Sequence, residues 1–404
     1  MKKPFFAFLV VACSILACTP AKTPEQIRKE LQEQMINAKS GDVILIPAGT
    51  LEMESSLILD GIDNITIKGA GIDKTILTFK NQKEGAEGLK VKSNHVLIEG
   101  MTLQDMKGDG IKVWESEDVT FRNLKIEWTR GPDTANGSYG LYPVKCNRVL
   151  IEYCFVSGAS DAGIYVGQSN DCIIRKNECT LSVQGIEAEN CNDVLIFDNK
   201  AWGNTSGISV NNLPDLPTKN GKNTRVYNNE LKDNNLANFG APGATVYIIP
   251  AGTGLFILSG NNVEVFSNHF ENHRTTGLGI ISFPITGRPM NDSLFDPFSR
   301  GIYVHDNTFI HHAGVLPDTS RQLGALMAKL FQTDVPEIIF DGLYDPKILA
   351  GGRGAIPPAE RICIRKNGDA RVATLDAGNE FKNLTIDATM LDCELNISVK
   401  TQHP

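Results

Sequence analysis

Acidic, basic and aromatic residues recur at matching positions of a sequence repeat between residues 109 and 189. The set consists of Asp109, Lys112, Trp114, Tyr139, Tyr142, Asp161, Tyr165, Glu187 and Glu189. Aromatic rings can pack against the flat faces of sugars, and lysine together with carboxylates suits acidic or hydroxyl-rich chains. Two carboxylates on one strand, such as Glu187 and Glu189, could act as a general acid and a general base. The residue types indicate a carbohydrate site if the fold places them on one surface.

A repeat of about 22 residues positions these side chains and runs from Asn94 to Asn211. Each copy contains a polar turn, an apolar triplet, a polar break and a Gly-apolar-x-apolar phrase, as in Gly163-Ile-Tyr-Val and Gly185-Ile-Glu-Ala. These apolar phrases are too short for helices and lie between Gly, Asn, Asp and Ser clusters, which is typical of short strands. A period of this length predicts a solenoid whose strands pair in parallel with their counterparts one coil later.

Alternation along each strand separates inner side chains from outer ones. The inner positions of three clear copies are Ile164 and Val166, Ile186 and Ala188, and Ile208 and Val210. Lys112, Tyr142, Tyr165 and Glu187 then form one outer row, with about 4.8 Å between coils. We predict substrate contacts for Asp109, Lys112, Trp114, Tyr142, Asp161, Tyr165, Glu187 and Glu189. The candidates for a catalytic role are Lys112, Tyr139, Tyr142, Tyr165, Glu187 and Glu189. An ordinary solvated sheet with cross-strand aromatic pairs would give the same pattern.

Four insertions interrupt the repeat next to the same strands. They span residues 130–138, 213–222, about 235–253 and 284–299. Insertions on one face of a repeat protein commonly border its binding face. Loops that only shield the sheet would be placed in the same way.

The phrase from Gly41 to Gly49 and the later strand phrases that end in asparagine resemble right-handed parallel β-helix proteins of the pectin-lyase-like superfamily. The whole chain looks most like an uncharacterised family of bacterial parallel β-helix lipoproteins. The resemblance implies an all-β, single-stranded right-handed parallel β-helix with an N-terminal capping helix and an irregular C-terminal cap. We assign residues 1–17 to a lipoprotein signal peptide, 18–40 to a tether and capping helix, 41–312 to the β-helix and 313–404 to the C-terminal cap.

The segment from Tyr139 to Val144 is similar to the Tyr-Gly-x-Asp-Pro-His signature of alginate C5-epimerases on this fold. It matches at Tyr139, Gly140 and Pro143, but Tyr142 and Val144 stand where that family has its catalytic Asp and His. Valine cannot abstract a sugar proton, and an unperturbed tyrosine does so poorly. A lyase would therefore need another base, with the three tyrosines and Lys112 as candidates.

The N-terminal residues predict export to the bacterial cell envelope. The chain begins Met-Lys-Lys, is apolar from Pro4 to Ala17 and reaches Ile15-Leu-Ala before Cys18. This segment is typical of a signal peptide and is too short to span a bilayer. Its end resembles the lipobox of bacterial lipoproteins, which implies a lipidated Cys18 at the periplasmic or outer-membrane surface. An ordinary secretory signal is the alternative.

The composition indicates which partners and metal ions the protein could bind. The formal net charge of −8 and the absence of a basic run argue against nucleic acid. The cysteines of the repeats predict buried thiols, and Cys363 could pair with Cys393. Carboxylates near Asp161 could bind Ca²⁺. Clustered histidines could instead serve a copper-site accessory factor, as in β-helix maturation factors of the periplasm; they are His269, His273, His305, His311 and His312.

A column of asparagines follows the second apolar phrase of successive coils, at Asn177, Asn199, Asn229, Asn268 and Asn307. Asparagine can both donate and accept, so stacked copies should bond one another along the solenoid. We expect a monomeric, lipid-anchored protein that binds an extended acidic polysaccharide along a solvent-facing sheet. Lyase-like or epimerase-like processing and a non-enzymatic envelope scaffold both remain open at this stage.

Overall fold

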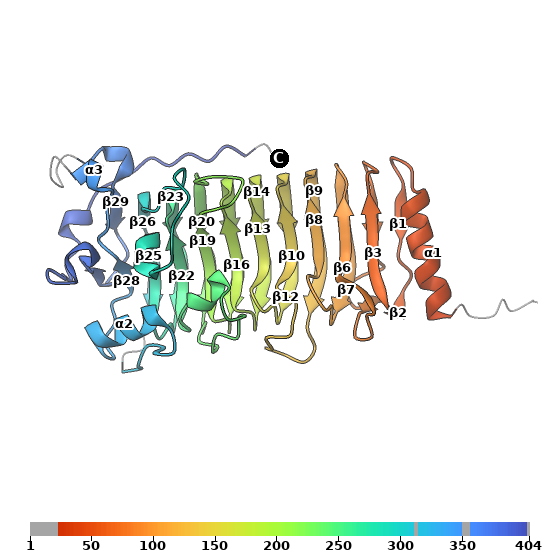
Figure 1. Cartoon of the computed structure of the whole chain (residues 1–404), viewed down its shortest axis with the longest axis horizontal. Coiled ribbons are helices and arrows are strands. Elements are labelled where there is room, and N and C mark those ends of the chain that lie inside the picture. The colour runs from red at the N-terminus through yellow and green to blue at the C-terminus, as the bar shows by residue number, and fades with distance from the viewer. Residues whose placement is uncertain (1–22, 311–313, 350–355, 402–404) are drawn as a thin grey trace, which may run out of the picture.

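The computed structural model describes residues 23–310, 314–349 and 356–401. The chain forms an elongated solenoid of parallel strands, with helix α1 (Pro24–Asn37) at its N-terminal end (Figure 1). One sheet has 11 strands and the other has 19. The predicted all-β solenoid is therefore confirmed. No helix among the described residues has the length and apolar character needed to cross a membrane.

The 11-stranded sheet contains β3 (Ser55–Asp60), β6 (Glu84–Lys92), β8 (Ile111–Trp114), β10 (Tyr139–Val144), β13 (Ala162–Gly167), β16 (Gln184–Glu189), β19 (Ser206–Asn211), β22 (Thr253–Leu258), β25 (Thr276–Ile281), β28 (Ile338–Phe340) and β30 (Val372–Thr374).

The strands of the 19-stranded sheet come from the chain segment before β3 and from the segments that connect successive strands of the 11-stranded sheet. They form two series along the solenoid. The first series is β1 (Val43–Leu45), β4 (Thr66–Lys68), β7 (Val96–Gln104), β9 (Glu117–Glu127), β11 (Asn147–Glu152), β14 (Asn170–Arg175), β17 (Asn192–Phe197), β20 (Thr224–Tyr227), β23 (Asn261–Phe266), β26 (Arg300–His305) and β29 (Ile362–Arg365). The second is β2 (Gly49–Glu52), β5 (Thr75–Thr78), β12 (Phe155–Ser157), β15 (Glu178–Thr180), β18 (Lys200–Trp202), β21 (Glu230–Lys232), β24 (His269–Glu271) and β27 (Thr308–Ile310).

Helix α1 covers the open first coil, as predicted. Thr23 caps its first turn through a reciprocal hydrogen-bond pair with Gln26. Leu31 and Met35 are buried against the coil, and the Gln32 side chain bonds the backbone of Ile58 in β3 through both its donor and its acceptor. These bonds satisfy part of an otherwise unpaired sheet edge.

The remaining helices lie in the insertions and the C-terminal region. They are the α-helices α2 (Gln322–Phe331) and α3 (Pro346–Leu349) and the 3₁₀ turns η1 (Thr245–Ile248), η2 (Phe283–Thr286), η4 (Pro358–Glu360), η5 (Ala377–Asn379) and η6 (Thr389–Leu391).

The inner side chains form one continuous apolar column. Ile164, Ile186 and Ile208 are in register on adjacent strands, and none of the three is exposed. The five described cysteines of the repeats are also buried and unpaired, as predicted. Stacking of like apolar residues accounts for the stability of the solenoid.

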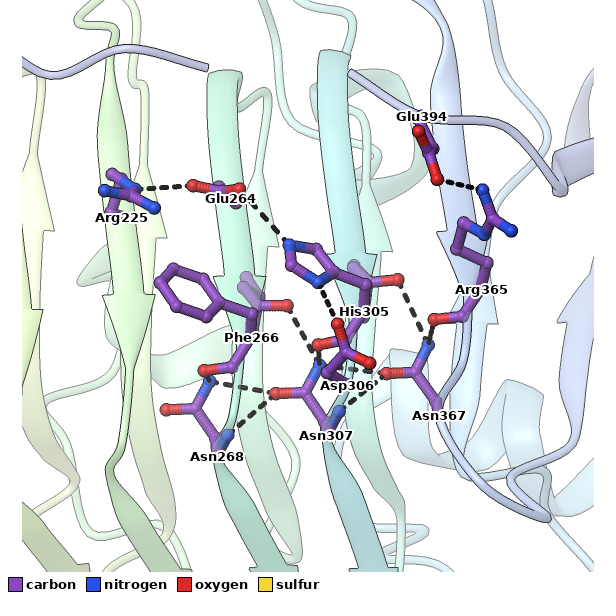
Figure 2. Close-up of polar contacts among 12 residues, drawn as sticks. Arg225, Glu264, Phe266, Asn268, His305, Asp306, Asn307, Arg365, Asn367 and Glu394 are labelled. Atoms are coloured by element: carbon purple, nitrogen blue, oxygen red, sulfur yellow. Dashed lines mark hydrogen bonds and ion pairs between the residues drawn. The ribbon is translucent and has the colours of Figure 1, made fainter. Parts of the chain in front are cut away.

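The asparagine ladder is confirmed and has one more rung than the sequence revealed. In each step the Oδ1 atom of one asparagine accepts bonds from the backbone N–H and the Nδ2 of the preceding one, as between Asn268 and Asn307 at 3.0 Å each. Asn307 makes the same two bonds to Asn367, at 3.1 and 3.0 Å (Figure 2).

The sheets also continue beyond residue 312, into the region for which the sequence predicts an irregular C-terminal cap. Strands β28, β29 and β30 extend the two sheets, pairing with β25, β26 and β28. Long insertions separate these strands and hide the repeat. The predicted disulfide joins Cys363 of β29 to Cys393. From there the chain runs back along the solenoid (Figure 1), and the backbone N–H of Lys400 donates to Asp193 at 3.0 Å.

Candidate functional site

The outer face of the 11-stranded sheet is open at its N-terminal coils. Lys90, Lys112 and Tyr142 occupy one row on β6, β8 and β10, and all three are half-buried. They border a groove of about 510 Å³. Its lining consists of Lys90, Lys112, Trp114, Glu115, Tyr142, Val144, Lys145, Gln168 and Pro217. The structure thus brings together the predicted Lys112, Trp114 and Tyr142.

Two of the groove lysines lie against aromatic rings. The Lys112 ammonium is 4.7 Å from the centre of the Tyr142 ring, and that of Lys90 is 5.4 Å from the Trp114 ring. Lys90 and Lys145 also approach Glu87 and Glu115, each at 3.8 Å. Lys112 makes no ion pair within residues 23–310, 314–349 and 356–401. Its charge is therefore available to an anionic ligand.

Three tyrosines form a compact cluster beside the groove. The Tyr139 ring centre lies 4.6 Å from that of Tyr142 and 4.4 Å from that of Tyr165. The Tyr165 ring lies over Gly167, where an added Cβ would come within 2.2 Å of the ring. Glycine at this position lets the ring lie flat on the sheet, and the Tyr165 hydroxyl then donates to Glu189 at 2.7 Å.

A group of carboxyls lies next to these tyrosines; Glu187 is buried, and Asp161 and Glu189 are half-buried. The Tyr139 hydroxyl donates to Asp161 at 3.3 Å. The Gln184 amide donates to Glu187 at 2.7 Å and to Asp161 at 3.4 Å. Asn211 donates to the other oxygen of Glu187 at 2.8 Å. In the described part of the chain, these carboxyls have hydrogen-bond donors but no basic side chain in ion-pair contact.

Desolvation raises the pKa values of these carboxyls and of nearby Asp109. Desolvation raises the pKa of Asp109 to about 6. Desolvation, reinforced by the charge of Glu189, raises the pKa of Asp161 to about 7. Burial also raises the pKa of Glu187 well above its ordinary value and raises that of Glu189. Asp161 can therefore hold a proton near neutral pH, whereas Asp109 releases most of its proton above pH 6.

The same burial makes the tyrosines poor bases. Desolvation raises the pKa of Tyr142 to about 12, and it raises the pKa values of Tyr139 and Tyr165 well above 10. Near neutral pH all three keep their hydroxyl protons. They are suited to donating hydrogen bonds, and this disfavours them as the base of a lyase.

The insertions close the rest of the sheet. Only 4% of Tyr165 and of Glu187 is exposed, and Ser209 and Phe256 in the same row are buried as well. The insertion residues Leu213 and Phe295, together with Phe283 just before the last insertion, pack on Phe256, Leu258 and Ile281. The expectation of a solvent-facing row up to Glu187 is therefore wrong, because strand alternation identifies the outer face but not what folds over it.

The structure also adds residues that the sequence analysis missed. Lys90 lies one coil before Lys112 in the same row, and extending the repeat back to β6 would have found it. Gln184 and Asn211 hold Glu187, and Lys145 follows β10 at a turn. No local pattern distinguishes these polar residues from ordinary turn residues.

The described residues contain no group of three or more His, Cys, Asp or Glu side chains arranged to hold a metal ion. His273 is buried and bonds the carbonyl of Leu231 at 3.1 Å. His305 lies between Glu264 and Asp306 on the other sheet (Figure 2). His311 and His312 lie outside the described residues, as does Cys18. The geometry thus offers no support for the copper alternative or for Ca²⁺ at Asp161.

The fold is a parallel β-solenoid with a groove on the outer face of one sheet. The sequence profile of the right-handed β-helix region matches residues 55–210 and 109–314, which is more than half of the chain. The chain belongs to this right-handed β-helix family.

Solved structures share the fold at low sequence identity. The A-module of the mannuronan C-5 epimerase AlgE6 from Azotobacter vinelandii is 15% identical, with a TM-score of 0.56 over 79% of this chain and 86% of that one. The A-module of AlgE4 from the same organism is 14% identical, with a TM-score of 0.52 over 78% and 87%.

Proposed function

We propose that this protein binds an extended acidic polysaccharide in the groove between Lys90 and Lys145 at the bacterial cell envelope. The observation that carries the proposal is the Lys112 ammonium, which lies over the Tyr142 ring and makes no ion pair within the described residues. Regularly placed lysines beside aromatic rings suit a chain of sugars that bears carboxylates. The mannuronan epimerases that share the fold act on such a chain.

Processing of the bound chain would use carboxyl chemistry. Asp109 lies within electrostatic range of Lys112 and Tyr142, and its pKa of about 6 suits a proton donor. Epimerase chemistry is less well supported, because Tyr142 and Val144 replace the expected Asp and His and the tyrosines stay protonated. A binding role without turnover is the second candidate, and the burial of Glu187 favours it.

The proposed envelope location has its support in the residues from Ile15 to Cys18, which match a lipoprotein signal. A lipid on Cys18 would hold the N-terminal end of the solenoid near a membrane. Mass spectrometry of membrane-extracted protein, compared with a Cys18→Ser variant, tests this part of the proposal directly.

Titration calorimetry with hexamers of galacturonate and of mannuronate tests the binding. Lys112→Gln should weaken the affinity for the preferred hexamer about tenfold, because one charge-assisted contact is worth about 1.4 kcal/mol. The matched control is Lys200→Gln on β18, whose lysine pairs with Glu230 at 3.4 Å on the other sheet. Failure of both hexamers to bind, or equal effects of the two variants, would contradict the proposal. Loss of turnover with intact binding in Asp109→Asn would identify processing.

A further inference from the structure

The groove is open at one end and blocked at the other. Successive residues of its central row change from exposed to buried along the axis. Ile58 on β3 is 44% exposed, Lys90, Lys112 and Tyr142 are half-buried, and Tyr165 on β13 is 4% exposed. The parallel row behaves in the same way, from exposed Asp60 on β3 to buried Leu258 on β22. The central row is closed from β13 onward, whereas the neighbouring row is buried at Gly167 and Asn211 and half-buried at Glu189 between them.

The inserted residues 213–222, here called the blocking segment, contribute to the closed end. Pro217 of this segment lines the groove. Leu213 packs against Leu258 and Ile281 on the outer face of the sheet. The blocking segment therefore lies across the path of any ligand that follows the axis from β6 toward β19.

Several contacts fix the blocking segment in place. The Asn190 side chain donates to the carbonyls of Leu213 at 3.0 Å and of Thr218 at 2.9 Å, and it accepts from the Leu213 N–H at 2.8 Å. An ion pair between Lys219 and Asp292 joins the segment to a second insertion. Buried hydrogen bonds of this kind oppose opening, so the block is a permanent part of the site.

The cations define the direction of a bound chain. Lys90 and Lys112 are partners in the register of neighbouring strands, so their side chains follow one another along the solenoid axis. Trp114 and Val144 are likewise partners on β8 and β10. An acidic chain that meets these side chains in turn must lie along the axis, and its leading sugar arrives at the tyrosine cluster and Pro217.

We propose that the site recognises the terminus of an acidic polysaccharide and excludes chain interiors. This inference rests on the proposed function. The terminal sugar would meet Tyr142 and the blocking segment, while the next sugars would contact Trp114, Lys112 and Lys90. Any bond cleavage beside the Tyr139 cluster would then release short products from one chain end.

A length series with the native protein tests the inference. The measured quantity is the ligand concentration at half-saturation, followed by fluorescence of Trp114 in the groove. The ligands are galacturonate and mannuronate chains from hexamers to sixty-residue polymers. If only ends bind, half-saturation expressed per sugar residue should rise about tenfold over this series, because each chain offers one site whatever its length. If chain interiors bind, that value should stay constant, which would overturn the inference and leave the proposed function intact.

Capped hexamers supply an independent measurement. One probe carries a bulky amide label at its reducing end, and the other carries an unsaturated sugar at its non-reducing end. Loss of binding with at least one cap supports terminus recognition and identifies the end. Unchanged binding with both caps would refute it. A complete lack of binding by uncapped hexamers would instead refute the proposed function, so the two failures are distinguishable.

Discussion

Replacement of Asp161 by asparagine should alter how the stability of this protein depends on pH. The pKa of Asp161 is raised from its ordinary value of 3.8 to about 7, mainly by burial and further by the charge of Glu189. Between those two pH values the folded protein holds a proton that the unfolded chain has already released. The free energy of unfolding therefore falls as the pH rises through this interval.

The size of the effect follows from the pKa. Each unit is worth about 1.4 kcal/mol, so a rise from 3.8 to about 7 corresponds to about 4 kcal/mol lost between pH 4 and pH 8. Asparagine has nearly the same shape and carries no charge at either pH. It should leave stability near pH 4 almost unchanged and raise it by a few kcal/mol at pH 8.

Urea denaturation of wild type and Asp161→Asn at one-unit steps from pH 4 to pH 8 measures this difference. Asp73→Asn, at an exposed turn, is the matched control and should follow the wild-type curve. Parallel curves for wild type and Asp161→Asn would show that Asp161 titrates alike in the folded and unfolded states. The account of a proton-holding carboxyl cluster would then be wrong.

Predictions for three further variants concern stability and are checked by urea denaturation at neutral pH. Cys146→Ser should change the free energy of unfolding by less than about 0.5 kcal/mol. Ser169 already occupies the same turn one coil later and donates to the carbonyl two residues back, at 2.9 Å, as the Cys146 thiol does at 3.5 Å. Cys179→Ser should cost about 1–3 kcal/mol, because its hydroxyl would be buried in an apolar row, and equal losses in both cysteine variants would refute the distinction. Gly279→Ala should stabilise by about 0.5–1 kcal/mol, because its Cβ would lie no closer than 3.6 Å to its nearest neighbour, Phe256, and a destabilised variant would contradict this packing.

The repeat made the solenoid predictable because one strand alternation recurs in every coil. The ladder from Asn177 to Asn307 was readable for the same reason, since each rung ends the same phrase. The place of Asn367 in the ladder could not be predicted, because 60 residues separate it from Asn307 and the intervening chain has no repeat. Local patterns thus predict what each coil does by itself, whereas closure of the C-terminal coils depends on contacts between distant insertions.

The candidate site shows the same division. Alternation correctly placed Lys112, Tyr142 and Tyr165 in one outer row. It could not show that Tyr165 lies over Gly167 or that Glu187 is buried. Those outcomes depend on side-chain packing, which alternation along a strand does not determine. The sequence therefore located the groove but not its blocked end, which decides what kind of chain it can accept.

The carboxyl cluster is difficult to explain as a support for the fold. Glu187 is buried on the outer face, whereas the same row carries Ser209 and Phe256 on the following coils, so the solenoid does not require an acid there. Burying carboxyls without a cation opposes folding, and such groups concentrate at functional sites. Asp161 and Glu187 meet beside the tyrosines at the blocked end of a basic groove. A protonated cluster in that position removes repulsion toward an arriving acidic sugar, which gives the cost in stability a reason in ligand recognition.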